Sequence, residues 1–200
     1  MLTSVDWTSL DKHNKFINSP EYGPFNEKLG EIMDGAALHH IEMRPFPPNI
    51  LTKAPCVEVA TFYNVEEGFI QNLNAFSQAV DTGKPKGFVG YATGEVVEQI
   101  TRPRDGSQEG KAAVLLFGWE SKEKHMEFRE TELFAKHIGL LREKNGGVEM
   151  VYLQAIRGSV EFVLLTVVLV SCLFQRRNEA LRLGYILTSR IWYCNFQRMK

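Results

Sequence analysis

Hydrophobic and polar positions along residues 56–156 follow periods that are typical first of strands and then of helices. β-branched and aromatic runs, which favour strands, cover residues 56–63, 88–99, 112–119 and 148–153. Between the first two runs, Ile70, Leu73, Phe76 and Val80 share one face of a predicted helix over 69–80. A second helix is predicted after Ser121, because serine is a favoured N-cap residue. The pattern predicts the element order β-α-β-β-α-β.

Residues 1–46 repeat the second half of this pattern. When residues 7–16 are aligned with residues 119–128, five residue types match. They are Trp7, Ser9, Lys12, His13 and Phe16, which correspond to Trp119, Ser121, Lys124, His125 and Phe128. After a three-residue offset, two apolar triplets also correspond, each with the spacing of a buried helical stripe: Phe25, Leu29 and Ile32 match Phe134, Ile138 and Leu141. The first copy therefore reads strand, helix, strand, and lacks the three elements that should precede them.

Proline positions distinguish the two copies of the helix. Ser19–Pro20 and Pro24 should break the first-copy helix into two pieces. The second copy has no proline there, so we expect its helix to run straighter. Four prolines in 44–55 predict a stiff, extended linker between the copies.

These patterns predict an α+β protein with four segments. Residues 1–46 form a partial half-unit, 47–55 the linker, 56–156 a complete ferredoxin-like unit, and 157–200 a tail of different character. The tail is apolar over 160–174 and then basic, and arginine replaces lysine as its main cation. It could be a marginal membrane anchor, an added strand and helix covering the sheet, or foreign sequence from a misread gene boundary.

Charge and cysteine content exclude several classes of protein. Residues 1–156 hold 16 Lys and Arg against 22 Asp and Glu, which argues against nucleic-acid binding. Three scattered cysteines (Cys56, Cys172 and Cys194) fit neither a disulfide framework nor a zinc site, so we expect no metal. The first residues do not resemble a secretion signal, and a cytoplasmic location is the expectation, with membrane association through 160–174 as the alternative.

The runs GFVGYATGEVVE, AAVLLFGWESKEKHMEFRETELF and GGVEMVYL resemble the antibiotic-biosynthesis-monooxygenase-like (ABM) family. More narrowly, they are similar to fungal tandem members of this dimeric α/β-barrel superfamily, here shortened at the N-terminus. The resemblance implies two four-stranded sheets packed face to face, with helices outside and a ligand cavity between the sheets. A shortened tandem chain would leave part of one sheet uncovered, so we expect a homodimer through the sheet faces.

The resemblance implies one of two functions. The first is a barrel that binds a small apolar or aromatic ligand and, in the oxygenase members, acts as a cofactor-free monooxygenase on a phenolic or polyketide-like substrate. The alternative is a non-catalytic binding or assembly module of the stress-responsive type. Haem is disfavoured because Phe16 and Phe128 stand where haem-degrading relatives place a histidine. We therefore expect no cofactor, and no residue is assigned as catalytic.

Six residues are candidates to line a cavity: Trp7, His39, Tyr63, Tyr91, Trp119 and His125. The tryptophans could hold an aromatic substrate or simply anchor the strand–helix corner by packing. His125 could act as a base or pack in the first helical turn, and His39 could face the cavity or solvent. The tyrosine hydroxyls could orient a phenol, or the rings could be ordinary half-buried strand residues.

Overall fold

A computed structural model describes residues 3–31, 37–104, 106, 108–154, 166–167 and 191–196. Residues 56–154 contain the complete unit predicted from the sequence. Its elements are β3 (Cys56–Tyr63), α4 (Phe69–Gly83), β4 (Phe88–Val96), β5 (Ala112–Trp119), α5 (Lys122–Arg129), α6 (Glu132–His137), α7 (Gly139–Arg142) and β6 (Gly147–Gln154).

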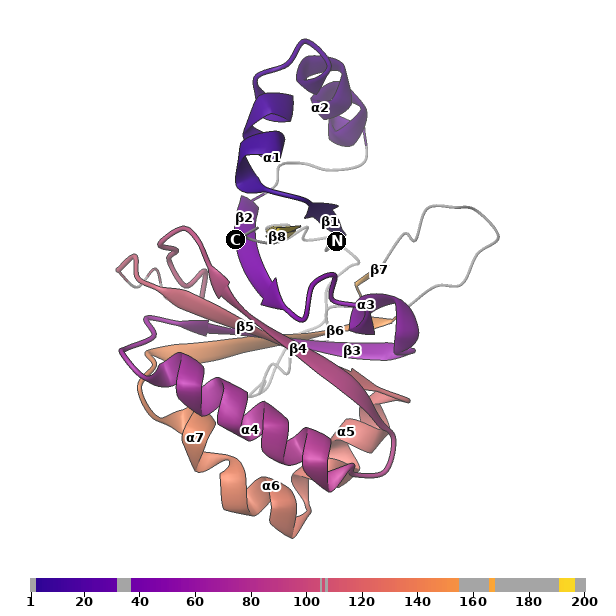
Figure 1. The fold of residues 1–200 in the computed structure, drawn as a ribbon, viewed down its shortest axis with the longest axis vertical. Coiled ribbons are helices and arrows are strands. Elements are labelled where there is room, and N and C mark those ends of the chain that lie inside the picture. Colours follow the sequence, from indigo (N-terminus) through magenta and orange to yellow (C-terminus); the bar gives the residue numbers. More distant parts are fainter. Residues whose placement is uncertain are drawn as a thin grey trace, which may run out of the picture.

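The strands of this unit lie in the order β4-β5-β3-β6, and each neighbouring pair is antiparallel. β3 therefore runs between the third and fourth strands of the unit, which is the ferredoxin-like arrangement. Helices α4 to α7 lie together on one face of the sheet (Figure 1). The predicted α+β, ferredoxin-like fold of the complete unit is confirmed.

The N-terminal segment, residues 3–31 and 37–44, adds a further strand to the edge of this sheet. Its elements are β1 (Thr3–Trp7), α1 (Leu10–Ile17), α2 (Tyr22–Gly30) and β2 (Ala37–Arg44). β2 pairs antiparallel with β4, with Ile41 opposite Val96, so the two parts of the chain share one sheet. Helices α1 and α2 lie at the far end of the molecule from α4 to α7 (Figure 1).

Two short segments of the tail also pair with strands. β8 (Ile191–Phe196) lies between β1 and β2 and runs parallel to both. In the complete unit, by contrast, the central strand β3 is antiparallel to both of its neighbours, β5 and β6. β7 (Thr166–Val167) pairs with β6. Residues 160–174, which the sequence analysis considered as a membrane anchor, lie outside the described residues except for β7. In the described part of the chain, no helix has both the length and the hydrophobicity to cross a bilayer.

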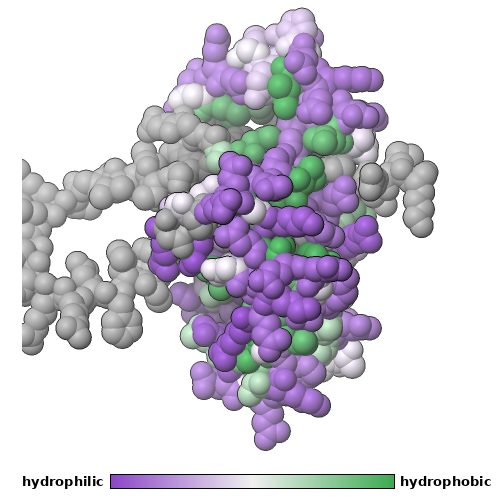
Figure 2. Space-filling model, turned by 90° about the vertical axis from the view of Figure 1, so that its left-hand side faces the viewer, coloured by the Kyte–Doolittle hydropathy of each residue, from purple (hydrophilic) through white to green (hydrophobic). Residues whose placement is uncertain are grey.

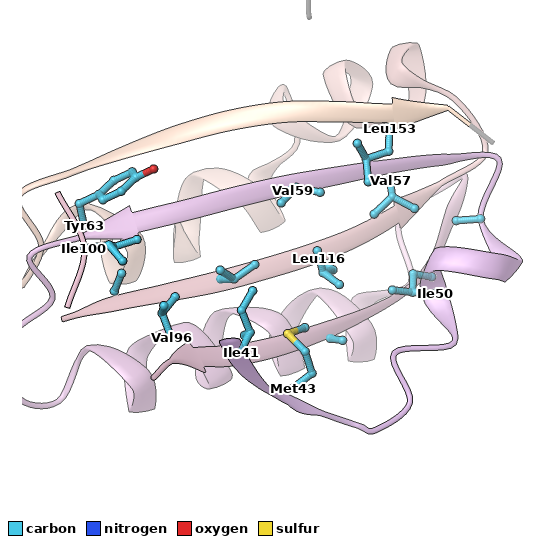
Figure 3. Close-up of a cluster of buried hydrophobic side chains, with 14 residues drawn as sticks. Ile41, Met43, Ile50, Val57, Val59, Tyr63, Val96, Ile100, Leu116 and Leu153 are labelled. Carbon is cyan, nitrogen blue, oxygen red and sulfur yellow. The ribbon is translucent and has the colours of Figure 1, made fainter. Parts of the chain in front are cut away.

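Side chains of the complete unit's sheet form one hydrophobic core on each face. On the face turned away from α4 to α7, the strand β2 and the short helix α3 (Ile50–Lys53) contribute side chains to the core (Figure 3). This core includes Ile41, Met43, Ile50, Val57, Val59, Val96, Leu116 and Leu153. The opposite core lies under the helices and includes Phe69, Leu73, Phe76, Val80, Phe117, Trp119 and Phe128. Alternation along each strand produces this division, because successive side chains point to opposite faces.

The structure corrects two details of the helices. The second-copy helix does not run straight but is divided into α5, α6 and α7. The first break lies at Thr131, whose hydroxyl donates to the Phe128 carbonyl at 2.6 Å and accepts from the Phe134 N–H at 3.2 Å, so it caps a new helix without any proline. The linker is not fully extended either, because α3 forms within it and Ile50 is buried.

Exposed hydrophobic side chains are scattered over several elements rather than gathered on the sheet face. They include Phe25 of the predicted helical stripe and the pair Val148 and Met150 on β6. On the face drawn in Figure 2, hydrophobic groups alternate with hydrophilic ones. The side chains of Val57, Val59 and Leu116, on the sheet face where we expected the homodimer, are buried within the chain. The homodimer stays a prediction.

Candidate functional site

Trp119 and His125 meet at the corner where β5 passes into α5. The Ser121 hydroxyl accepts the Lys124 N–H at 3.4 Å and so caps α5, as the sequence predicted. This cap places His125 in the first turns of the helix, directly over the last residue of the strand. The Trp119 and His125 rings stack with their centroids 5.2 Å apart and their planes 18° apart. Both side chains are buried.

Two further polar side chains reach the same imidazole from the sheet. Tyr152 on β6 places its hydroxyl oxygen 2.6 Å from His125 Nδ1. Glu58 on the central strand β3 places Oε2 3.4 Å from the same nitrogen. Tyr152 and Glu58 are register partners in the β3–β6 pair, which fixes their positions relative to each other. The strand register thus brings together side chains that are far apart in the sequence.

The burial of Glu58 is the most unusual feature of this cluster. The residue is only 6% exposed, although charged side chains are almost never fully buried without a partner. The Trp119 indole N–H is near enough to lower the carboxyl pKa. Even so, neither Trp119 Nε1 nor Glu58 Oε2 makes a hydrogen bond of good geometry to any described residue. Buried polar atoms without partners are rare and often mark functional positions.

Burial moves the pKa values of the two groups in opposite directions. Desolvation raises the pKa of Glu58 to about 7, while the Trp119 N–H and the Arg129 charge oppose the shift. Desolvation, assisted by the Arg129 charge, lowers the pKa of His125 to about 4. At neutral pH the imidazole is therefore uncharged, and the carboxyl is divided between its protonated and ionised forms. A group that changes charge near neutral pH is suited to proton transfer.

A cavity of about 230 Å³ opens beside these residues, between the sheet and α5 to α7. Glu58 and His125 contribute the buried polar groups of its wall, and Phe76, Phe117 and Phe128 contribute buried aromatic surface. This cavity lies on the helix-covered face, and the cavity that the resemblance implies between two sheets stays a prediction. On the other face, side chains of β2, α3 and their neighbours form a packed aliphatic core.

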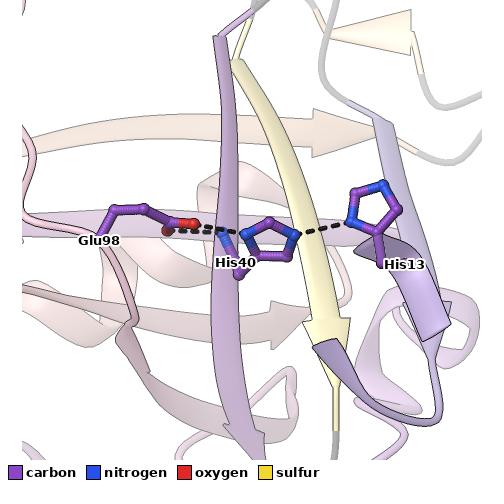
Figure 4. Close-up of polar contacts among 3 residues, drawn as sticks. All are labelled: His13, His40 and Glu98. Carbon is purple, nitrogen blue, oxygen red and sulfur yellow. Dashed lines mark hydrogen bonds and ion pairs between the residues drawn. The ribbon is translucent and has the colours of Figure 1, made fainter. Parts of the chain in front are cut away.

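The N-terminal segment contains a related cluster. Trp7 stacks on His13 with centroids 4.6 Å apart, and the Ser9 hydroxyl caps α1. His13 Nδ1 lies 2.7 Å from His40 Nε2, and His40 in turn contacts Glu98 through Nδ1 and donates its backbone N–H to Glu98 Oε2 at 2.9 Å (Figure 4). Glu98 follows β4, so this cluster joins the N-terminal segment to the complete unit.

Of the six residues predicted to line a cavity, only His125 lines this one, and Trp119 stacks directly on it. Trp7 belongs to the N-terminal cluster, and His39 is half-buried on β2. Tyr63 is buried in the core of the opposite face. Tyr91 packs edge-on against Phe117, with ring centroids 6.2 Å apart, but does not line the cavity.

Sequence reasoning missed Glu58, Tyr152, His40 and Glu98. One signal was available for Glu58, because it is the single charged residue in an otherwise apolar and aromatic strand over 56–63. Nothing local marks the other three, since their roles depend on strand register and on contacts across the sheet. The described residues contain no group of three or more acidic, histidine or cysteine side chains arranged to hold a metal ion.

The chain is similar in structure to several solved proteins. An anthrone oxidase-like protein matches with 16% identity and a TM-score of 0.41 over 53% of this chain. A putative antibiotic biosynthesis monooxygenase from Bordetella bronchiseptica matches with 20% identity and a TM-score of 0.38 over 52% of this chain and 100% of its own. Another from Deinococcus radiodurans matches with 14% identity and a TM-score of 0.37 over 52% of this chain and 94% of its own.

This chain spans about half (46%) of the anthrone oxidase-like protein. No family model matches the sequence, and no curated protein is significantly similar to it. The ferredoxin-like arrangement of the complete unit follows from the order and directions of its own strands.

Proposed function

We propose that this protein binds a small aromatic molecule in the cavity under α5 to α7 and that Glu58 removes a proton from it. The observation that carries the proposal is the buried Glu58 carboxyl, which borders the cavity and whose Oε2 has no hydrogen-bond partner among the described residues. An acidic O–H or C–H of a ligand would supply the missing contact. His125, which also lines the cavity and whose Nδ1 lies 2.6 Å from the Tyr152 hydroxyl oxygen, would orient that group.

The size of the cavity limits the ligand. Its volume of about 230 Å³ is below the range of about 300–1,000 Å³ that is typical of ligand pockets. A molecule of one or two rings suits this space, and a large polycyclic polyketide does not. The aromatic lining favours a flat ring system, because offset and edge-to-face contacts with Phe76, Phe117 and Phe128 are favourable.

The chemistry needs no bound cofactor. With a pKa near 7, Glu58 is partly ionised at neutral pH and can take a proton from an activated CH₂ group of the ligand. The resulting carbanion can transfer electrons to O₂. In the balanced reaction, R₂CH₂ and O₂ give R₂C=O and H₂O, so the substrate supplies both electrons that reduce the second oxygen atom. This is the reaction of a cofactor-free monooxygenase.

The proton-transfer step can be measured separately from oxidation. 2-Tetralone, a two-ring ketone with an acidic benzylic CH₂, would be incubated with the full chain in D₂O without oxygen, and deuterium uptake followed by NMR. We expect catalysed exchange with the wild type and a loss of about 100-fold or more in Glu58→Gln, since a general base contributes about 10²–10⁴-fold. Glu67→Gln, an exposed acid in the loop before α4, is the matched control.

Admitting oxygen then tests the second step, with diketone formation and oxygen consumption as readouts. Exchange without oxidation would support the base and contradict the monooxygenase. Binding of 2-tetralone without any exchange would favour the alternative, a non-catalytic binding module. No binding at all would contradict the proposed function in both forms.

A further inference from the structure

Two arginine side chains form part of the cavity wall that faces solvent. Arg129 is the last residue of α5 and Arg142 the last residue of α7, and both are exposed. The Arg129 guanidinium carbon lies over the Phe134 ring, 5.9 Å from its centroid, in a cation–π contact. Within the described residues, neither arginine forms an ion pair with a carboxylate.

The cavity therefore has a positive electrostatic character. Its wall contains two guanidinium groups and one carboxyl group, that of Glu58. The Arg129 charge is close enough to both Glu58 and His125 to lower their pKa values. Whether Glu58 is ionised or protonated, the net charge of the lining stays positive.

Polar and apolar groups are separated along the cavity. Buried aromatic side chains form its interior, whereas Val148 and Met150 on β6, 45% and 41% exposed, form an apolar rim. The arginines belong to the exposed part of the wall. A ligand that matched this distribution would bury a ring system inside and hold an anionic group near solvent.

We propose that the cavity takes an aromatic acid whose carboxylate contacts Arg129 and Arg142 while its rings lie among the buried phenylalanines. This inference rests on the proposed function, to which it adds the charge of the ligand. Guanidinium groups bind carboxylates through paired, charge-assisted hydrogen bonds, which a neutral ligand of the same shape cannot make. The carboxylate would also fix which end of the ring system reaches Glu58.

Calorimetric titration of the full chain with 2-naphthoate and with 2-naphthamide tests the inference, because the two probes have nearly the same shape and differ in charge. We expect 2-naphthoate to bind at least about tenfold more tightly, because charge-assisted hydrogen bonds from guanidinium groups to a carboxylate are stronger than those to a neutral amide. Arg142→Met and Arg129→Met should each weaken 2-naphthoate about tenfold and leave 2-naphthamide within about threefold. Arg104→Met, an exposed arginine that does not line the cavity, should change neither affinity.

Equal affinities for the two probes, or equal losses of both in the arginine variants, would overturn the inference. Tight but charge-independent binding would leave the proposed aromatic cavity standing and reject only the acid. If neither probe binds, the acid and the proposed function both fail. Circular dichroism of each variant would show that any loss of binding is not a loss of folding.

Discussion

Tyr152 Oη lies 2.6 Å from His125 Nδ1, and the two residues are 27 positions apart. His40 lies 2.7 Å from His13 at the same separation of 27 positions. In each case the histidine stacks on the tryptophan that ends the preceding strand. The matching geometry parallels the sequence match between the two segments. The segments differ in the acid that completes the cluster, which is Glu58 in one and Glu98 in the other.

Replacement of Phe128 by alanine should be strongly destabilising. Phe128 is 2% exposed and packs on both Trp119 and Phe134, so its removal leaves a cavity in the core. Urea unfolding should show a loss of about 3–5 kcal/mol. Phe16→Ala, at the corresponding position of α1, should cost less because Phe16 is only half-buried. A Phe128→Ala change within about 0.5 kcal/mol of the wild type, the range of surface substitutions, would contradict the assigned packing.

Glu58 should make the stability of the fold depend on pH. Burial raises its pKa from 4.5 to about 7, so the folded state binds this proton more tightly than the unfolded state. The contribution is fully present below pH 4.5 and is lost as the pH rises through 7. Relative to Glu58→Gln, the wild type should lose about 3 kcal/mol of unfolding free energy as the pH rises across this window. Urea unfolding at pH values from 4 to 8 would measure it, and a difference that does not change with pH would contradict the buried carboxyl.

His125 should make the stability of the fold depend on pH in the opposite sense to Glu58. Its pKa is lowered from 6.5 to about 4, so the neutral ring stabilises the folded state above pH 6.5, and this contribution is lost as the pH falls through 4. Between pH 4.5 and 6.5 the two effects partly cancel in the wild type. His125→Gln should therefore be less sensitive to acid than the wild type below pH 6. Thermal unfolding across this range would show it, and equal acid sensitivity would indicate an exposed ring.

Glu98→Gln should loosen the N-terminal segment without affecting the cavity. The Glu98 carboxylate accepts two hydrogen bonds from His40, and these contacts lower its pKa despite partial burial. Because the side chain is 37% exposed, we expect a loss of only about 1 kcal/mol. Hydrogen exchange should become faster in β2 and remain unchanged in β3 and β5. Uniform acceleration in all three strands would mean that the segment does not open separately.

The strands of the complete unit could be predicted closely from sequence because their signals are local. Residues 56–63 and 112–119 are continuous runs of β-forming residues, and the structure places β3 and β5 over the same ranges. The Ser121 cap was equally local, since a hydroxyl before a helix needs only the first turn as its partner. Both predictions depend on neighbours within a few residues.

The candidate site could be predicted only in part because it depends on distant register. The sequence identified Trp119 and His125 through their recurrence, but Glu58 and Tyr152 become neighbours only when β3 pairs with β6. The break at Thr131 was missed because a threonine side chain can cap a new helix where no proline stops the old one. The cavity under α5 to α7 was not predicted, because periodicity does not show where side chains leave a space.

The measurement that tests the central claim most directly is a crystal structure of the full chain with 2-naphthol. The account predicts that the rings lie between the sheet and α5 to α7, against Phe117 and Phe128, with the hydroxyl within hydrogen-bond distance of Glu58 or His125. A naphthol bound on the opposite face, near Tyr63, would contradict the proposed site. So would a cavity that stays empty at a concentration of 2-naphthol at which calorimetry shows the protein to be saturated.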